Sequence, residues 1–231
     1  STNVHNRWKE QDPESLVAGA INSVTQALKL GSISPKDCVG ISIGGAFHSL
    51  LALDSKNVPL TGVMTWADNR AKGQAELLRQ QGLASRFYQA TGCPPHSLYP
   101  FFKIQWLRET NPGLFDRMAW FLSAKEYLLY RFTGQRIVDY SIAGATGLLN
   151  VKQLVWDPEI LGLASITSER LSTLASPASK IGSLTLEASA QMGLTPGTPV
   201  YLGSSDALNS SIGAGASTAS QATCMIGTSG A

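Results

Sequence analysis

The sequence predicts an α/β protein with helical insertions, and three observations lead to this fold class. Short apolar segments that alternate with small residues, a pattern typical of buried strands, occur in the first third of the chain and again near residue 200. The middle carries large apolar side chains at helical spacing, with glycine and proline between the runs. The 231 residues, 43% of them hydrophobic, are enough to bury one substantial core or two modest ones.

The first element is a helix that begins after Asp12. The Asp12 carboxylate serves as N-cap, Pro13 occupies the first helical position, and apolar residues recur along one face as far as Leu28. Gly31 ends the helix. Three strands follow, over residues 38–43, 48–53 and 63–67, and a turn at 54–57 joins the second and third as a hairpin or meander.

After Asp68 the pattern becomes helical. Gly82, Gly92 and Gly134 end helical runs, and Asn111-Pro112-Gly113 interrupts another. Helices are therefore predicted over residues 69–81, 83–90, 101–110, 113–118 and 123–132, and a later short helix near 185–192 leads into a buried strand over 198–202.

Charge and composition argue against several classes of partner. Lys and Arg number 18 against 16 Asp and Glu, and they are scattered, so we expect no nucleic acid partner. Residues 207–231 carry no charge, but they are too rich in Ser, Thr and Gly for a membrane-spanning helix. The sequence shows no signal peptide, and its three cysteines lack zinc-ligand spacing, which predicts a cytoplasmic protein.

Asp206 is the strongest catalytic candidate. It is the only charged residue between Ala188 and Ala231, and it follows the strand predicted over 198–202. Ligands of open α/β sheets bind at the carboxyl ends of strands, and a carboxylate without a neighbouring cation can accept a proton from an alcohol. The alternative is that Asp206 is the N-cap of a helix.

Two further groups of residues are candidates for ligand contacts. The glycine turn Gly227-Thr228-Ser229-Gly230 offers backbone N–H groups and two hydroxyls to a phosphate, or it is an ordinary hairpin turn. The ends of two predicted strands carry polar and aromatic side chains that could line a pocket for a polyhydroxylated molecule, although each could also be structural. These residues are His48, Trp66, Asp68 and Arg70.

Seven short motifs follow one another along nearly the whole chain in a characteristic order. They are Glu10-Gln11-Asp12-Pro13, Ala46-Phe47-His48-Ser49-Leu50, Thr65-Trp66-Ala67-Asp68-Asn69-Arg70, Tyr99-Pro100 with Lys103-Ile104-Gln105-Trp106-Leu107-Arg108, Asp139-Tyr140-Ser141, Gly203-Ser204-Ser205-Asp206 and Gly227-Thr228-Ser229-Gly230. In this order they resemble the FGGY family of carbohydrate kinases. Within the family, the residues His48-Ser49-Leu50 and Trp66-Ala67-Asp68-Asn69-Arg70 are most similar to those of gluconate kinases, followed by xylulose kinases.

The resemblance implies a ribonuclease H-like, actin-type ATPase fold with two lobes. Residues 1–200 would form the sugar-binding lobe and residues 201–231 the start of the nucleotide-binding lobe. By the same resemblance Asp206 is the base that takes a proton from the sugar hydroxyl. His48 and Trp66 would line the sugar pocket, with Asp68 and Arg70 shaping the same strand end. Gly227, Thr228 and Ser229 would face the phosphates of ATP, bridged by Mg²⁺, for which the sequence identifies no ligands.

Two departures from the family pattern suggest a fragment. No strand with an Asp-x-Gly-Thr turn precedes Ser1, and the sequence ends at Ala231 without a glycine-rich adenine-binding segment. We therefore expect the polypeptide alone to have little or no kinase activity.

The substrate of the expected kinase is a small sugar or sugar acid. The first choice is gluconate, phosphorylated to 6-phosphogluconate, with Arg70 as the nearest cation for its carboxylate. The alternatives are a kinase for xylulose or another ketose or polyol, and a sugar-binding module without catalysis. The sequence leaves the oligomeric state open, with a homodimer among the options.

Overall fold

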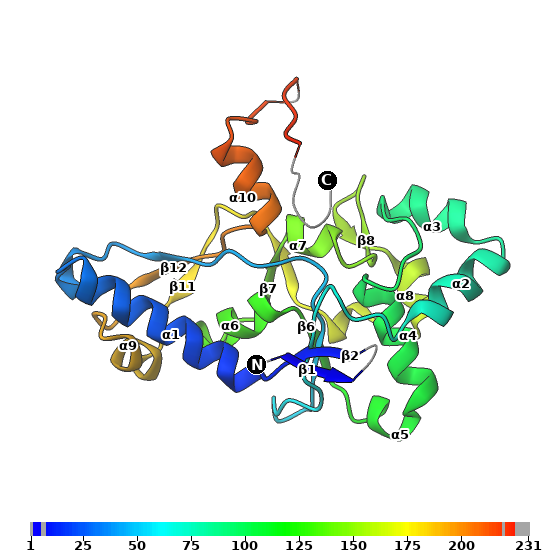
Figure 1. Ribbon diagram of the computed structural model, residues 1–231, viewed down its shortest axis with the longest axis horizontal. Helices are drawn as coiled ribbons and strands as arrows, with labels where there is room; N and C mark the ends of the chain where they lie inside the picture. The colour runs from blue at the N-terminus through cyan, green and yellow to red at the C-terminus, as the bar shows by residue number, and fades with distance from the viewer. Residues whose placement is uncertain (1, 6–7, 219, 225–231) are drawn as a thin grey trace.

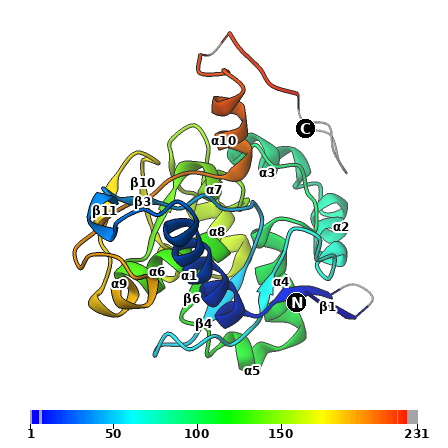
Figure 2. The ribbon, with the colours of Figure 1, turned by 60° about the vertical axis from the view of Figure 1, so that its left-hand side comes forward.

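The computed structural model describes residues 2–5, 8–218 and 220–224. Figure 1 shows helix α1 with β11, β12 and α9 in one half of the molecule, and α2, α3, α4, α5 and α8 in the other half. Helix α10 projects from the top in both Figure 1 and Figure 2. Among these described residues, no helix is both long enough and apolar enough to cross a lipid bilayer.

Helix α1 spans Pro13–Leu30 and confirms the first predicted element. Asp12 Oδ2 accepts a hydrogen bond from the Ser15 N–H at 2.7 Å, which satisfies one of the free donors of the first turn. The N–H of Gly31 donates to Ala27 O at the other end. The apolar face of α1 packs against α6 and α9, so the first helix joins residues from the middle and the end of the chain.

The other helices include the five predicted for the middle of the chain and the predicted short helix near residue 190. These six are α2 Lys72–Gln80, α3 Ala84–Thr91, α4 Pro100–Thr110, α5 Pro112–Phe115, α6 Ala124–Thr133 and α9 Leu186–Met192. The sequence analysis did not identify α7 Tyr140–Gly144 or α8 Pro158–Ala164, and it offered α10 Asp206–Gly213 only as an alternative. Helices α7 and α8 contain five and seven residues, so neither is long enough to show two full helical periods. The similarly short α5 and α9 have a proline or a glycine at one end, which marks a helix boundary in the sequence.

The strands are short, and within the described residues they form five small sheets. Their bounds are β1 Thr2–His5, β2 Trp8–Gln11, β3 Ile41–Ser42, β4 Leu51–Leu53, β5 Val63–Met64, β6 Trp120–Leu122, β7 Ile137–Asp139, β8 Leu149–Asn150, β9 Val155–Trp156, β10 Thr173–Ala175, β11 Lys180–Ser183 and β12 Pro199–Tyr201. The sheet orders are β1-β2-β5, β11-β12-β3, β4-β6, β10-β7 and β8-β9. Strand β3 runs parallel to β12, which joins segments far apart in the sequence.

The hairpin predicted between the second and third strands forms only in part. Two isolated antiparallel bridges, Leu50 with Met64 and Leu53 with Pro59, connect the two segments. The continuous strand pairings of these two segments involve other strands, since β4 pairs with β6 and β5 pairs with β2. Local sequence predicted β4 and β5, but it predicted neither β6 nor β2, the strands with which they pair.

Strand β4 lies between two hydrophobic cores. Leu50 and Ala52 belong to a core shared with α2, α3, α4 and α8, whereas Leu51 and Leu53 belong to a core shared with α1, α6 and α9. Successive side chains of a strand point to opposite faces, so this segment is buried on both sides. The core around β4 thereby fixes the chain that leads from His48 into the interior.

Candidate functional site

The candidate site lies where the loops that follow β3 and β12 meet. Because the two strands are parallel, their carboxyl ends share one edge of the sheet. The Gly45 N–H donates to Ser204 O at 3.3 Å, and the Asp206 N–H donates to Gly45 O at 2.9 Å. These bonds place Asp206 beside the loop that carries His48.

Asp206 is the first residue of α10, and the N-cap is Ser205. The Ser205 hydroxyl accepts a hydrogen bond from the Leu208 N–H at 3.2 Å. The alternative in which Asp206 itself is the N-cap is therefore wrong, because the preceding serine fills that position. Asp206 is exposed, its Oδ1 accepts from the Ala207 N–H at 2.8 Å, and no ion pair within the described residues includes it. The carboxylate thus remains available to a hydroxyl.

His48 presents a neutral imidazole to the same region. Its Nδ1 lies 2.7 Å from Ala145 O, and because a carbonyl only accepts, Nδ1 carries the proton and Nε2 the lone pair. The ring stands edge-on to Tyr99, with 4.9 Å between centroids. Burial lowers the pKa of His48 to about 4, although the bond to Ala145 and the charge of Asp206 both favour the protonated form. The two side chains therefore lie within electrostatic reach of each other.

Lys103 is a residue of this region to which the sequence analysis gave no role. Its ammonium group donates to His48 O at 2.6 Å and to Thr65 O at 2.7 Å, so it ties the His48 loop to the segment before Trp66. The side chain is buried, and burial lowers the pKa of Lys103 to about 7. The sequence carries one signal for this structural role. Lys103 lies among apolar residues at the start of α4, and a cation in such a stretch requires buried hydrogen-bond partners.

Trp66 and Asp68 lie in the loop between β5 and α2, and they differ in exposure. The Trp66 side chain is 56% exposed and offers an apolar surface to solvent, as a residue that packs against a sugar would. Asp68 is fully buried. Its Oδ2 accepts from the Lys9 N–H at 2.9 Å, which fastens β2 to the loop that carries Trp66.

Arg70 is enclosed by protein groups. Its Nε donates to Asp68 Oδ1 at 3.0 Å, and its Nη2 donates to Glu10 Oε1 at 2.5 Å. The guanidinium carbon lies 4.5 Å from the ring centre of Trp8 and 4.8 Å from that of Trp106. Asp68 and Arg70 thus hold the strand end together, and the cation lies close to two indole rings that are nearly perpendicular to each other.

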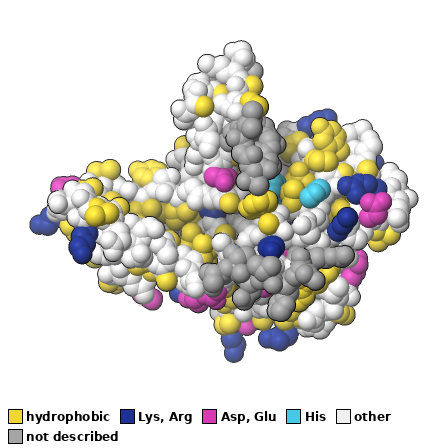
Figure 3. Space-filling model, viewed as in Figure 1, with side chains coloured by type: hydrophobic (Ala, Val, Ile, Leu, Met, Phe, Trp, Pro, Cys, Tyr) yellow, Lys and Arg dark blue, Asp and Glu magenta, His cyan; other side chains and the backbone are white. Residues whose placement is uncertain are grey.

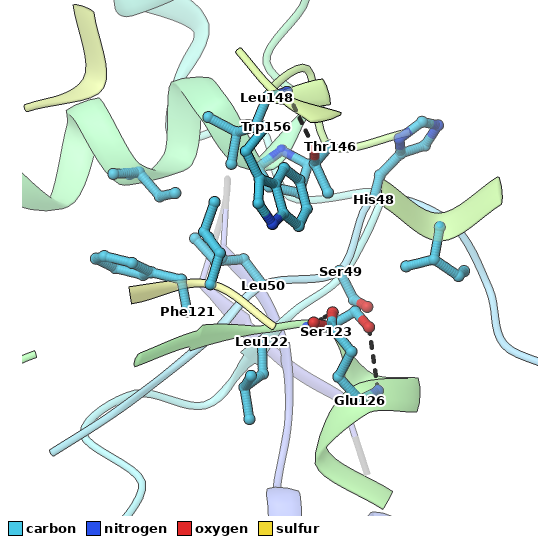
Figure 4. Close-up of a pocket in the computed structure, with 14 residues that line it drawn as sticks. His48, Ser49, Leu50, Phe121, Leu122, Ser123, Glu126, Thr146, Leu148 and Trp156 are labelled. Carbon is cyan, nitrogen blue, oxygen red and sulfur yellow. Dashed lines mark hydrogen bonds between the residues drawn. The ribbon is translucent and has the colours of Figure 1, made fainter. Parts of the chain in front are cut away.

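The cavity in Figure 4 lies on the interior side of His48. Figure 4 shows the imidazole pointing away from this cavity, and nine of the 14 residues that line it are apolar, including Leu50, Phe121 and Trp156. The polar groups at its lower edge satisfy each other, because Ser123 and Glu126 form a reciprocal capping box at the start of α6. A polyhydroxylated ligand would therefore lie on the outer side of His48.

A wider hollow of about 420 Å³ occurs on the surface near α2. It is lined by Asn69, Lys72, Ala75, Arg79, His96 and Ser97. Figure 3 shows imidazole and basic side chains gathered on this part of the molecule. A charge on His96 would lower the pKa of His48 further, so the two imidazoles lie within electrostatic reach of each other. This hollow provides cations that are not enclosed as Arg70 is.

The nucleotide contacts expected from the sequence cannot be placed. Gly227, Thr228 and Ser229 lie outside the described residues. Within residues 2–5, 8–218 and 220–224, no group of three or more His, Cys, Asp and Glu side chains is arranged to hold a metal ion.

Comparison with known proteins identifies the family. The sequence model described as the N-terminal domain of the FGGY family of carbohydrate kinases matches residues 1–213. A gluconokinase of Bacillus licheniformis is 35% identical over 222 residues, which cover 96% of this chain and 43% of that protein. A xylulose kinase of Bacillus subtilis (strain 168) is 30% identical over 223 residues, which cover 96% of this chain and 44% of that protein.

The structural comparison agrees with the sequence comparison. The crystal structure of gluconate kinase from Lactobacillus acidophilus superimposes with a TM-score of 0.89 at 31% identity, covering 93% of this chain and 43% of that chain. The predicted α/β class of the ribonuclease H-like, actin-type ATPase fold is confirmed, and the chain spans less than half the length of these relatives. The chain belongs to the FGGY family of carbohydrate kinases and matches its N-terminal domain.

Proposed function

We propose that this chain is the sugar-binding part of an ATP-dependent kinase that phosphorylates a hydroxyl group of a sugar or sugar acid. Gluconate, converted to 6-phosphogluconate, is the proposed substrate. One observation carries the proposal, namely that the exposed Asp206 carboxylate, which forms no ion pair with another described residue, and the neutral His48 imidazole lie on the segments that follow the parallel strands β12 and β3. We further propose residues 1–200 as the sugar-binding lobe and residues 201–231 as the start of the nucleotide-binding lobe.

In the proposed mechanism Asp206 is the general base. Its carboxylate accepts the proton of the substrate hydroxyl while the oxygen forms a bond to the γ-phosphorus of ATP and the bond to the β–γ bridging oxygen breaks, which releases ADP. Nε2 of His48 accepts a hydrogen bond from another hydroxyl, and Trp66 packs against the C–H groups of the sugar. Mg²⁺, when bound with ATP, would neutralise the charge of the phosphates. The described residues form no cluster of His, Cys, Asp and Glu that could hold it.

The choice of gluconate requires a partner for its carboxylate. Arg70 is occupied by Glu10, Asp68 and two indole rings, which makes it a poor candidate for this role. Lys72 in the hollow beside His96 is exposed and forms no ion pair with another described residue. We therefore assign the carboxylate contact to Lys72, whereas xylulose, which is uncharged, would not use it.

Calorimetric titration of the 231-residue chain with gluconate, xylulose and glycerol tests this proposal. We expect gluconate to bind most tightly. His48→Ala should weaken gluconate and xylulose alike by ~10-fold, the effect of about one hydrogen bond. Lys72→Met should weaken gluconate alone, and Lys29→Met, at the opposite end of the molecule on α1, should change neither (Figure 1).

The pH dependence of the same titration gives a second criterion. Because the pKa of His48 is about 4, its ring keeps one protonation state from about pH 5.5 upward, so His48 itself should cause no change in xylulose affinity between pH 5.5 and 8. A change centred near pH 7 would come from Lys103, whose pKa is about 7 and whose ammonium group holds the His48 loop. Absence of binding by all three compounds, or binding that His48→Ala leaves intact, would contradict the proposed site. Tighter binding of xylulose than of gluconate would favour the ketose kinase instead.

The isolated chain should have little or no kinase activity. It spans 43% of the length of the gluconokinase relative, and the proposed phosphate turn lies at its very end. A coupled assay for ADP release, with and without gluconate, measures this directly. Sugar-dependent ADP release by the purified chain would contradict this prediction.

A further inference from the structure

The Asp139-Tyr140-Ser141 motif lies at the end of β7 and the start of α7, and its serine contacts the residue that precedes the candidate base. Asp139 is fully buried and caps α7, because its Oδ1 accepts from the N–H groups of Ser141 at 3.0 Å and Ile142 at 3.2 Å. Its Oδ2 accepts from the buried ammonium group of Lys125 at 2.6 Å. The carboxylate is thereby held from both sides.

The Ser141 hydroxyl connects this buried pair to α10. It donates its proton to Asp139 Oδ1, which turns an oxygen lone pair outward. That lone pair accepts the Ser205 N–H at 2.9 Å. Ser205 directly precedes Asp206, so a hydroxyl oriented by a buried carboxylate fixes the peptide that leads into the proposed base.

A second bond from the same region holds the next peptide. The Asp206 N–H donates to Gly45 O at 2.9 Å, and Gly45 lies against the side chain of Lys125. A Cβ added at Gly45 would approach the Lys125 Cβ to 2.7 Å, closer than real Cβ atoms come. Lys125 therefore contributes to both hydrogen bonds that hold the backbone at residues 205 and 206. It pairs with Asp139, which orients Ser141, and it packs against Gly45.

These contacts matter because the Asp206 side chain has little support of its own. Its carboxylate is exposed and bonds only to the N–H of the adjacent Ala207 among the described residues. The direction of the carboxylate therefore depends on the backbone at residues 204–206. A base that is displaced by a fraction of an ångström loses rate, because proton transfer depends on the alignment of donor and acceptor.

We propose that Ser141, oriented by the Lys125–Asp139 pair, is the positioning residue for the base Asp206. The proposal rests on the proposed function. Ser141 touches neither substrate nor phosphate in this role; it sets where the carboxylate of Asp206 stands when the hydroxyl arrives. Asp139 and Lys125 act one step further back, since they set the direction of the Ser141 hydroxyl.

The test compares Ser141→Ala with Ser141→Thr in a polypeptide of full family length that contains this chain. Loss of the hydroxyl should lower kcat by ~10-fold or more with little change in KM for the sugar, because only the reacting geometry is disturbed. Threonine keeps a hydroxyl at the same position and should restore kcat. Ser189→Ala removes a buried hydroxyl that bonds only within α9, so it serves as the matched control.

Amide hydrogen exchange on the 231-residue chain gives an independent readout. Ser141→Ala should accelerate exchange of the Ser205 N–H, and Ser189→Ala should not. Unchanged kcat in Ser141→Ala, or a loss that threonine does not restore, would overturn the positioning role. Asp206→Asn separates this from failure of the proposed function: if that variant keeps full turnover, Asp206 is not the base, whatever Ser141 does.

Discussion

Replacing Asp206 by asparagine is expected to lower kcat by roughly 10²- to 10⁴-fold, the range that a positioned general base contributes. The amide is nearly isosteric with the carboxylate but cannot accept the proton of the hydroxyl. Steady-state kinetics of a full-length family enzyme that contains this chain measure the loss, and calorimetry on the same variant measures sugar affinity. Affinity should stay within ~2-fold, since the amide can still bond to a hydroxyl.

The structure makes this variant a clean test of catalysis. Ser205 is the N-cap of α10, so Asp206→Asn removes no cap, and the thermal unfolding midpoint should barely change. Asp37→Asn, an exposed aspartate in the loop before β3, is the matched control and should leave kcat unchanged. Retained turnover in Asp206→Asn would favour the sugar-binding module without catalysis over the kinase.

Local signals in the sequence predicted the helices well. Asp12 before Pro13 defined the start of α1, and the bond from the Ser15 N–H shows the physical basis of that prediction. Ser123 with Glu126 three residues later forms the capping box of α6, within one residue of the predicted start. Capping depends on residues a few positions apart, so the information is present in any short window of sequence.

Strand partners and buried ion pairs could not be predicted in the same way. Lys125 and Asp139 are 14 residues apart, and Ser141 meets Ser205 across 64 residues. Arg70 was predicted as the partner of a substrate carboxylate because it is the nearest cation to the expected pocket, whereas Glu10 and two tryptophans enclose it only in three dimensions. The absence of other charged residues between Ala188 and Ala231 identified Asp206 as a candidate, because this feature can be read directly from the sequence.

The buried Lys125–Asp139 pair is expected to be a major determinant of stability. Burial lowers the pKa of Lys125, and the carboxylate of Asp139 opposes that shift, so the charged pair persists only because each member balances the other. Lys125→Met keeps the length of the side chain and leaves Asp139 buried without a cation. Removing one partner of a buried pair costs ~3–5 kcal/mol, and we expect the free energy of unfolding to fall by this amount.

Urea denaturation of the 231-residue chain measures this loss, and a double variant shows its cause. Lys125→Met combined with Asp139→Asn should recover part of the stability, because the remaining amide can still bond to Ser141 while no buried charge is left unpaired. Arg86→Met, which breaks the exposed pair with Glu159, should cost far less. Equal losses of stability in Lys125→Met and Arg86→Met would contradict this prediction, because they would require water to reach Lys125 freely although its side chain is only 1% exposed.

The Lys125–Asp139 pair connects the interior of the protein to the candidate site. The Asp139 carboxylate that stabilises the fold also orients the Ser141 hydroxyl, and that hydroxyl accepts the N–H of the residue before Asp206.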